Sequence, residues 1–530
     1  MVAKTWSVAF SGVRSLPVEV QVSLASGLPS FVIVGLGDKP VAESRERIRA
    51  ALEASGLKLP PKRIVVNLAP ADLVKEGSHF DLPIALALLA SIGVIESEPL
   101  AGILALGELG LDGRIAPVSG ILPAAFAAQE ARRRLICPRP QAHEASLVEG
   151  LEYCAAESLA EIVSHFAPGV EAESPFVRSG GAEWPPRSDG AHSGGEPAVA
   201  APRDLAEVKG QEMARRALEV AAAGGHNMLL IGPPGAGKSL LAHALPGILP
   251  PLVVSEALEI SKIHSLAGTL LNGGLISSRP FRDPHHSASL AALAGGGARA
   301  RPGEVSLAHR GVLFLDELPE FSRSTLEALR QPMEVGEVTV SRASAHETYP
   351  ARFQLVAAMN PCRCGEFGIV SRHCGRAPRC AREYQARVSG PLLDRIDIHV
   401  EVAAVPPVEL AARRGGESSA VVAERVLGAR AVQTERARRV GGGDGAAPHC
   451  NAELEGEALE VFCALDKKAH SVLARAAERY RLSARGWNRI LRVARTIADL
   501  EGEERITAVG VAEALEWRRK EWGDSAAAAP

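Results

Sequence analysis

The first part of the chain alternates apolar and polar residues in short runs, a pattern typical of half-buried strands. The apolar positions of the first run are Val18, Val20, Val22 and Leu24. A second strand-like run covers Arg63–Ala69, and the Ala/Leu-rich run Phe80–Ile92 predicts an apolar helix. Residues Leu104–Val118 predict a hairpin, in which Asp112-Gly113 would supply the positive φ angles of a tight turn. Residues 1–165 are therefore expected to form a mixed α and β domain.

The pattern changes after this first domain. Residues 166–203 are rich in Pro, Gly and Ser with little apolar periodicity, which predicts a flexible linker. Residues 204–402 alternate helical patterns with short apolar strands, the plan of a parallel α/β sheet. Strands expected in this part include Asn227–Ile231 and Gly311–Leu315. Residues 403–523 are mainly helical in pattern, and residues 524–530 are expected to be a disordered tail.

Composition narrows the class of protein. The chain has 530 residues, of which 46% are hydrophobic and 23% charged, values typical of a globular protein with several domains. Because 59 Lys and Arg face 62 Asp and Glu, the net charge of −3 excludes a globally basic nucleic-acid coat. Any contact with DNA must then come from local basic patches.

No apolar run is long enough to span a bilayer, and the first residues lack the plan of a secretion signal. We therefore expect a cytoplasmic protein with no membrane partner. In that compartment the eight cysteines are expected to be thiols or metal ligands rather than disulfides.

A phosphate-binding loop is the strongest local motif. The pattern G-x-x-x-x-G-K-[ST] is matched by Gly232, Pro233, Pro234, Gly235, Ala236, Gly237, Lys238 and Ser239. It follows an apolar strand and opens a helical run, as the chemistry requires. Backbone N–H groups would wrap the phosphates, Lys238 would reach the β and γ oxygens, and Ser239 would bind Mg²⁺. The sequence thus predicts ATP and Mg²⁺ as cofactors.

Two later strands end in residues that would complete this site. The strand Gly311–Leu315 runs into Asp316, placed to bind Mg²⁺, and Glu317, placed to activate an attacking water. A third apolar strand, Leu355–Met359, ends at Asn360, whose amide could orient that water.

Four cysteines follow Asn360 within a short stretch. They are Cys362, Cys364, Cys374 and Cys380, with the spacing C-x-C-x₉-C-x₅-C. Four thiolates at such spacing could hold a structural Zn²⁺, and reduced free thiols are the alternative.

These motifs together resemble a known family. Asp204–Gln211 resembles the lead-in segment of AAA+ ATPases. Longer motifs resemble the YifB/ComM family of magnesium-chelatase-like ATPases, and they are Arg279–Ser287, Gly303–Gly311, Leu315–Phe321 and Ser389–Asp397. The resemblance implies a multidomain α/β protein with a central AAA+ P-loop domain over 204–402, a helical lid over 403–523 and assembly into a hexamer.

The resemblance also implies roles for two arginines. Arg395 would be the arginine finger that reaches the γ-phosphate of the neighbouring subunit, and Arg485 would be the second sensor on the lid. The alternative for both is a structural ion pair. Arg485, Arg489 and Arg492 share one helix face, while another face is predicted to be buried, with Ile490, Val493 and Ile497.

Two insertions are expected to contact DNA. One precedes Asp316, and the other, Val335–Arg342, alternates like a hairpin strand. In related ring helicases such hairpins line the pore and grip the DNA backbone. The candidates for DNA contacts are Arg282, His285, His286 and Arg342. Solvated loops or subunit packing are the alternative for each residue.

The N-terminal segments Leu73–Asp81 and Gly107–Gly120 resemble the Lon-type protease fold, an α+β domain. The resemblance aligns His79 with the nucleophilic serine and Leu122 with the catalytic lysine. Leucine cannot accept a proton, so the domain over 1–165 is expected to be catalytically inactive. Ser78 and Lys75 lie close to these positions in sequence and leave the register open.

The resulting hypothesis is an ATP-dependent hexameric DNA translocase or helicase. By resemblance it would promote branch migration in homologous recombination and natural transformation, with single-stranded or branched DNA as its partner. The alternative is a metal-chelatase-type ATPase motor that remodels a protein partner. A regulatory scaffold, in which the ATPase only switches assembly, is a third class.

Overall fold

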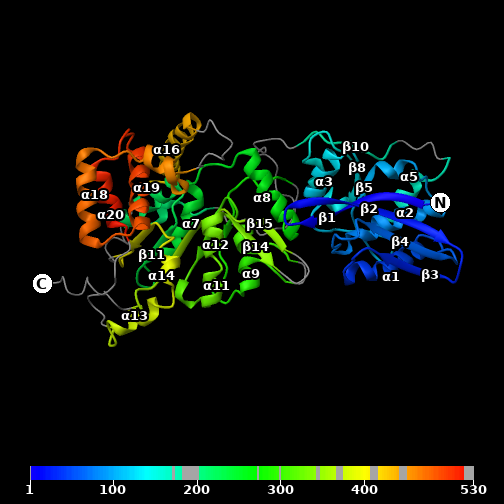
Figure 1. Ribbon diagram of the computed structural model, residues 1–530, viewed down its shortest axis with the longest axis horizontal. Coiled ribbons are helices and arrows are strands. Elements are labelled where there is room, and N and C mark those ends of the chain that lie inside the picture. Colours follow the sequence, from blue (N-terminus) through cyan, green and yellow to red (C-terminus); the bar gives the residue numbers. More distant parts are fainter. Residues whose placement is uncertain are drawn as a thin grey trace.

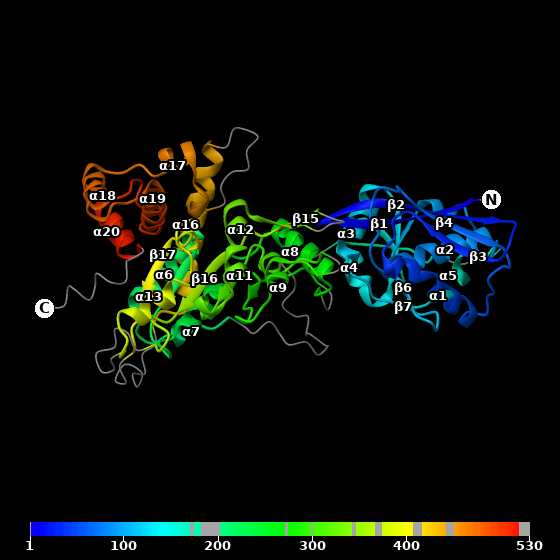
Figure 2. The ribbon, with the colours of Figure 1, turned by 60° about the horizontal axis from the view of Figure 1, so that its bottom comes forward.

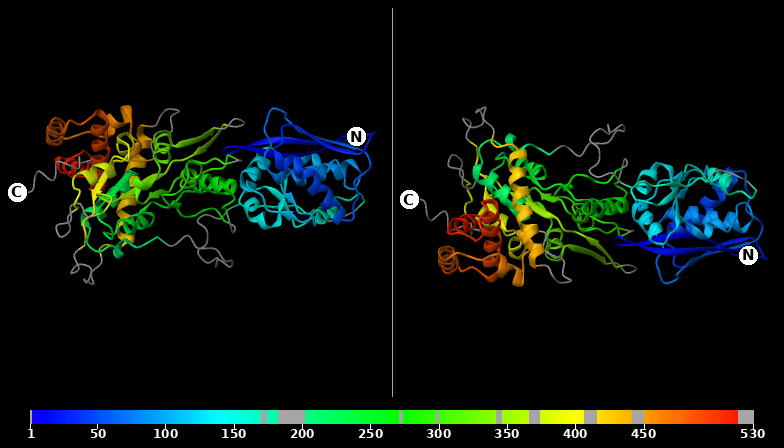
Figure 3. Two further views of the ribbon diagram at one scale, coloured as in Figure 1. Left: turned by 90° about the horizontal axis from the view of Figure 1, so that it is seen from below. Right: turned by 90° about the horizontal axis from the view of Figure 1, so that it is seen from above.

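The computed structural model describes residues 2–169, 174–181, 202–270, 274–297, 300–341, 346–365, 374–405, 416–440 and 450–518. The protein is elongated, with an N-terminal α/β domain at one end, a helical lid at the other and a second α/β domain between them (Figure 1). The three parts keep this order along the long axis in the two further views (Figure 3). None of the helices in the described part of the chain is long and apolar enough to cross a bilayer.

The N-terminal domain is built on one mixed sheet with the strand order β10-β9-β8-β5-β1-β2-β4-β3. The predicted strand runs are confirmed in β2 and β4, whose polar alternation leaves one face buried. The strands are β1 Val2–Ser11, β2 Arg14–Ala25, β3 Ser30–Val34, β4 Arg63–Ala69, β5 Ile103–Ala105, β8 Arg134–Pro138, β9 Glu152–Ala156 and β10 Val177–Arg178. The helices are α1 Lys39–Ala54, α2 Asp81–Ser91, α3 Ile121–Glu130, α4 Ala142–Ser146 and α5 Leu159–Phe166.

The predicted apolar helix and hairpin are both present. Helix α2 is buried over ten of its residues, which explains why its sequence is apolar on every side. The hairpin consists of β6 (Glu108–Leu109) and β7 (Ile115–Ala116), and it is shorter than predicted because Leu104 belongs to β5. Only Gly113 takes a positive φ, of 83°; Asp112 instead accepts a hydrogen bond from the backbone N–H of Arg114. The Asp112 side chain thus supports the turn, while the Asp112 backbone stays outside the left-handed region.

Part of the predicted linker is ordered structure. Residues 174–181 return to the sheet, where β10 pairs with β9 in an antiparallel manner. Phe176 packs against the domain core, and the guanidinium of Arg134 lies 4.3 Å from the centre of its ring. Residues 182–201 and the expected tail lie outside the described residues.

A buried ion pair holds α1 against α2. The fully buried carboxylate of Asp81 accepts hydrogen bonds from Arg47 Nε at 2.5 Å, Arg47 Nη2 at 2.9 Å and the N–H of Leu109 at 3.2 Å. Ser44 donates to the same carboxylate. Burial raises the pKa of Asp81, while the hydrogen bonds from Arg47 and Ser44 oppose that shift.

Arg47→Ala should therefore destabilise the N-terminal domain by about 3–5 kcal/mol, because it leaves a buried carboxylate without its cation. Hydrogen exchange of the α1 and α2 amides in the full-length protein measures this loss as a lower free energy of opening. Arg45→Ala is the matched control, since Arg45 is half exposed and pairs with the adjacent Glu46. Equal protection in the two variants would contradict the prediction.

The central domain has a five-stranded parallel sheet with the order β12-β13-β16-β11-β17. This confirms the predicted parallel α/β plan, and the inner strands β11 and β13 are apolar and fully buried, as expected for strands covered on both sheet faces. The strands are β11 Met228–Ile231, β12 Phe281–Arg282, β13 Val312–Leu315, β16 Gln354–Met359 and β17 Ile398–Glu401. The main helices are α6 Glu212–Gly224, α7 Lys238–Ala244, α8 Val254–Ala267, α9 Leu290–Ala294, α10 Glu304–Leu307, α11 Arg323–Glu327, α12 Arg330–Val335, α13 Arg379–Gln385 and α14 Gly390–Leu393.

The C-terminal part is helical, as predicted. Its helices are α16 Ser419–Val440, α17 Gly456–Phe462, α18 Lys467–Tyr480, α19 Ala484–Leu500 and α20 Ala508–Glu516. Ile490, Val493 and Ile497 of α19 are buried, which confirms the predicted apolar face. They join one hydrophobic core with α6 and β11, so the lid and the central sheet share their packing.

Among the described residues, contacts between the N-terminal and central domains include those at α8 and at the tip of the β1–β2 hairpin. At α8, the ammonium of Lys262 lies 3.9 Å from the ring centre of Phe126, and Ser265 donates to the buried Glu144. The tip of the β1–β2 hairpin lies against β15 (His346–Pro350), which pairs with β14 (Glu337–Ser341) (Figure 2). At this tip a Cβ on Gly12 would lie 2.2 Å from the carbonyl oxygen of Thr348, so a glycine is required for the close approach.

Candidate nucleotide site

The predicted phosphate loop connects β11 to α7 at the carboxyl end of the sheet. A Cβ on Gly232 would lie 2.1 Å from the carbonyl oxygen of Val402, and Gly237 has a φ of 91°. Both positions therefore need glycine, which places the loop backbone close to the strand ends. The loop residues 234–240 line a pocket together with Asp316, Glu317, Met359 and Asn360.

Lys238 lies at the bottom of this pocket. Its ammonium donates to the carbonyl oxygens of Gly232 at 2.8 Å and Pro233 at 2.9 Å, and to Asn360 Oδ1 at 3.1 Å. Burial lowers the pKa of Lys238, while the carboxylates of Asp316 and Glu317 oppose that shift. A polyphosphate in the pocket would supply further negative charge to this buried cation.

The residues expected to hold Mg²⁺ are in contact. Ser239 Oγ donates to Asp316 Oδ2 at 2.8 Å, and the other carboxylate oxygen of Asp316 accepts from the N–H of Glu317. A hydroxyl and a carboxylate side by side are the hard oxygen ligands that Mg²⁺ prefers, with phosphate oxygens completing its coordination. These residues therefore fit the ion.

Glu317 is held in an unusual conformation. Its φ of 51° lies in the left-handed region, which is uncommon outside glycine, and its carboxylate contacts the segment that follows β12. There His286 Nδ1 lies 3.3 Å from Glu317 Oε2, and the ring of His286 lies 4.1 Å from that of His285. The sequence indicated these histidines only as DNA contacts, and the contact of His286 with Glu317 was not predicted.

A further acid near the pocket was also missed. Asp283, directly after β12, lies 3.9 Å from His243 of α7. Burial raises the pKa of Asp283, a shift that His243 opposes and the charge of Asp316 reinforces. The signal was present in the motif Arg279–Ser287, but a lone Asp in that motif does not indicate which strand end it will face.

The two predicted catalytic arginines lie outside the pocket lining and share one acidic partner. Arg395 donates through Nη2 to Glu334 of α12 and through Nη1 to the carbonyl oxygen of Pro391 at 2.6 Å. Arg485 Nη2 lies 3.4 Å from the same Glu334 carboxylate, and its side chain is 67% exposed. Glu334 thus brings the finger candidate and the lid candidate together, although they are distant in sequence.

The remaining basic candidates make intrachain contacts. Arg282 forms a bidentate ion pair with Glu304, with distances of 2.6 and 2.8 Å. Arg489 and Arg492 of the predicted basic stripe donate to the carbonyl oxygens of Ile396 and Leu454. These intrachain contacts differ from the alternative given for Arg282, a solvated loop or subunit packing, and their residues stay candidates for DNA contact only as a prediction. Arg342 lies outside the described residues.

The residues aligned with a peptidase dyad do not form one. His79 is 5% exposed, with Nε2 2.9 Å from the carbonyl oxygen of Val8 and its ring packed on Phe80. Leu122 is buried in α3. Ser78 Oγ donates to Glu108, while the ammonium of Lys75 donates to the carbonyl oxygen of Pro70. The inactivity of this domain stays a prediction.

The thiols of the cysteine cluster come together. Sγ atoms of Cys362, Cys364, Cys374 and Cys380 all lie within 4.8 Å of one another. The sequence spacing predicted these four cysteines as a group, and the fold brings the pair Cys362 and Cys364 next to the pair Cys374 and Cys380.

Three family models match successive parts of the chain. The model described as subunit ChlI of Mg-chelatase matches residues 18–141, magnesium chelatase subunit ChlI matches 204–410, and the ChlI C-terminal model matches 416–518. The competence protein ComM of Haemophilus influenzae is 44% identical, over 97% of each chain. The chain belongs to the ComM/YifB family.

Other relatives agree with this placement. The uncharacterized protein YifB of Salmonella typhimurium is 43% identical over 96% of this chain and 95% of its own. The magnesium-chelatase 67 kDa subunit of Chlorobaculum parvum is 29% identical over 29% of this chain and 23% of its own. This chain is therefore a magnesium-chelatase-like protein of the AAA+ ATPase type. The Lon-type likeness of the N-terminal domain stays a prediction.

Proposed function

We propose that this ComM/YifB family member is a cytoplasmic ATPase that translocates DNA as a hexamer and promotes branch migration in homologous recombination and natural transformation. One observation carries the ATPase part of the proposal. A single pocket holds the phosphate loop with Lys238, the Ser239–Asp316 pair, Glu317 and Asn360. The phosphate loop, the candidate Mg²⁺ ligands and the groups proposed to position and activate water are thus within one cavity.

The proposed chemistry assigns one task to each residue. Lys238 would leave its present carbonyl partners for the β and γ oxygens of ATP, and Asn360 would orient a water molecule. Glu317 would accept the proton of that water as its oxygen attacks the γ-phosphorus and the bond to the ADP oxygen breaks. Mg²⁺, held by Ser239 and Asp316, would neutralise phosphate charge.

The position of the arginines supports assembly into a ring. Arg395 and Arg485 meet at Glu334 and do not line the pocket of their own subunit. A hexamer would present both guanidinium groups to the nucleotide of the next subunit. The exposed Glu334 would keep the arginines oriented until a phosphate replaces it as their partner.

The DNA part of the proposal rests on two observations. A relative with 44% identity over nearly the full length carries the name competence protein ComM. In addition, the β14–β15 hairpin corresponds to the predicted pore loop, and it lies against the N-terminal domain. Both observations are compatible with a ring that grips single-stranded or branched DNA through its central hairpins.

A chelatase-type motor that remodels a protein partner is the second candidate. One observation favours it: part of this chain is 29% identical to a protein named magnesium-chelatase 67 kDa subunit. This candidate predicts an ATPase that is indifferent to DNA and that copurifies with a large partner protein.

The steady-state ATPase rate at low salt separates the two candidates. We expect turnover to rise at least about tenfold with single-stranded DNA or a four-way junction, and to fall again with added salt as phosphate contacts are screened. Lys238→Ala is the inactive blank, and Lys468→Ala on the exposed face of α18 is the matched control. Robust turnover that no DNA changes would favour the protein-remodelling motor.

A further inference from the structure

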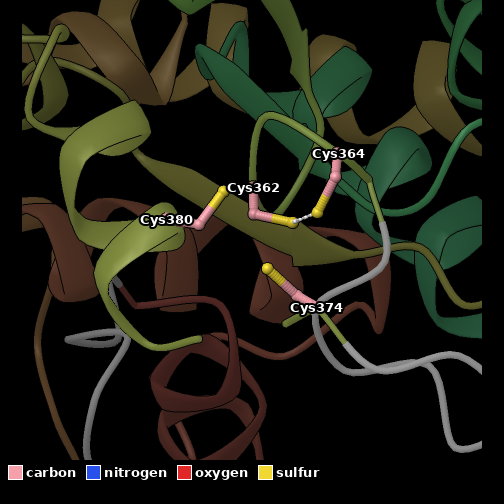
Figure 4. Close-up of side chains that lie close together, drawn as sticks. All are labelled: Cys362, Cys364, Cys374 and Cys380. Atoms are coloured by element: carbon pink, nitrogen blue, oxygen red, sulfur yellow. Dashed lines mark hydrogen bonds between the residues drawn. The ribbon is translucent and has the colours of Figure 1, made fainter. Parts of the chain in front are cut away.

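The four clustered thiols come from two segments that are separated in the sequence. Cys362 and Cys364 lie in the loop directly after β16, whereas Cys374 and Cys380 lie before and within the first turn of α13. Figure 4 shows the four side chains approaching one another, with Cys362 Sγ 3.1 Å from Cys364 Sγ. Cys362 is buried, and Cys374 and Cys380 are partly buried.

This geometry suits one tetrahedral metal ion. Zn–S bonds of about 2.3 Å place the sulfurs of a tetrahedral site about 3.8 Å apart. All four sulfurs here lie within 4.8 Å of one another, and the 3.1 Å between Cys362 Sγ and Cys364 Sγ is longer than the S–S bond of about 2.05 Å in a disulfide. A polynuclear cluster would need room for its own sulfides between the thiolates. Four thiolates without imidazole or carboxylate ligands favour Zn²⁺ among the common metals.

Two arginines lie close in sequence to the ligands of such a centre. Four thiolates and one Zn²⁺ carry a net charge of −2, which needs cations or hydrogen-bond donors. Arg363 lies between the first two cysteines and Arg376 between the last two. Both residues are exposed, and the contact of Arg376 with Glu383, at 3.7 Å, is an exposed ion pair that contributes little, so both side chains can move toward the sulfurs without breaking a buried contact.

The first pair of cysteines is attached directly to the nucleotide pocket. Asn360, two residues before Cys362, bonds the ammonium of Lys238. Gly365 follows Cys364, and a Cβ there would lie 2.6 Å from Pro234 Cδ, so this loop touches the phosphate loop. From the other side, Gln385 at the end of α13 donates to the carbonyl oxygen of Pro361 at 2.9 Å.

We propose that Cys362, Cys364, Cys374 and Cys380 bind one Zn²⁺, and that the ion clamps α13 to the loop that carries Asn360 and touches the phosphate loop. The metal site stands independently of the proposed function, whereas its effect on ATP turnover rests on the ATPase proposal. Loss of zinc would free the loop on which Asn360 and Pro234 depend, and would weaken nucleotide binding while leaving Lys238, Asp316 and Glu317 in the chain.

Metal analysis of the full-length protein, purified under reducing conditions, tests the site. We expect one zinc per chain, and less than about a tenth of that in Cys374→Ser/Cys380→Ser, which removes half of the ligands. Cys154→Ala, a buried cysteine of the N-terminal domain, is the matched control and should keep its zinc. A reduced wild-type sample without stoichiometric zinc, or with iron in its place, would overturn the assignment.

Two further measurements keep the proposal testable if the double variant does not fold. Cobalt substituted into the wild-type protein should give the visible absorption of a tetrahedral thiolate site, and octahedral or absent bands would overturn it. Removal of zinc with a chelator that leaves Mg²⁺ in excess should lower the affinity for a fluorescent ATP analogue about tenfold, and added Zn²⁺ should restore it. Unchanged affinity without zinc would overturn the clamp. Stoichiometric zinc in a protein that hydrolyses no ATP would instead refute the proposed function alone.

Discussion

Glu317→Gln should bind ATP with unchanged affinity and hydrolyse it about 10²- to 10⁴-fold more slowly. The amide keeps the size of the side chain but cannot accept the proton of the attacking water. Glu317 is suited to that role because it follows the Mg²⁺ candidate Asp316 and lines the pocket with Asn360. Its left-handed φ of 51° is uncommon for a residue other than glycine.

Glu320→Gln provides the control for this experiment. Glu320 lies in the same short 3₁₀ turn, yet it pairs with Arg387 at 2.9 Å and does not line the pocket. Its substitution should leave turnover within about twofold of wild type, as expected for an exposed ion pair. A single-turnover experiment with a fluorescent ATP analogue measures both nucleotide binding and the rate of hydrolysis. Normal turnover by Glu317→Gln would remove this residue from the proposed mechanism.

The second large effect is expected for Arg395→Ala, which should reduce ATP turnover by about 10³- to 10⁵-fold in the assembled ring. The guanidinium would neutralise the charge that develops on the γ-phosphate of the neighbouring subunit. In the single chain Arg395 is only 11% exposed, bonded to Glu334 and Pro391, and its Nε is buried without a hydrogen-bond partner.

Mixing two inactive variants tests whether Arg395 acts on the neighbour. Subunits with Arg395→Ala keep an intact pocket, and subunits with Glu317→Gln keep an intact finger, so mixed rings should regain part of the wild-type rate. Arg387→Ala is the matched control, because Arg387 forms a surface ion pair with Glu320. If mixing restores nothing while both variants still assemble, the arginine acts within its own subunit or only in packing.

The contact between Glu317 and His286 links the nucleotide pocket to the insertion that follows β12. His286 belongs to the segment after β12 that the sequence indicated as a DNA-contacting insertion, and its ring also faces Phe321 across 6.5 Å. A displacement of this segment would move His286, the contact partner of the proposed base Glu317. The same geometry allows nucleotide state and the insertion to influence each other, because the contact is reciprocal.

Local sequence patterns determined the elements of this protein and the phosphate loop. Strand β4 and the buried face of α19 follow from residue periodicity, since periodicity decides which side of an element can be buried. Strand β16 and helix α2 follow instead from short runs that are apolar on every side. The order of strand, glycine-rich loop and helix around Lys238 is a continuous stretch of chain, so its geometry is set almost entirely by neighbouring residues.

Only the tertiary structure decided how distant residues meet. The partner of Glu317, the meeting of Arg395 and Arg485 at Glu334, and the return of residues 174–181 to the first sheet all depend on strand order and on packing. Sequence spacing says nothing about such neighbours, because the free energy of these contacts depends on which elements the whole fold places side by side. The sequence by itself therefore determined which chemical groups the nucleotide pocket contains, while the tertiary structure decided which partners hold them.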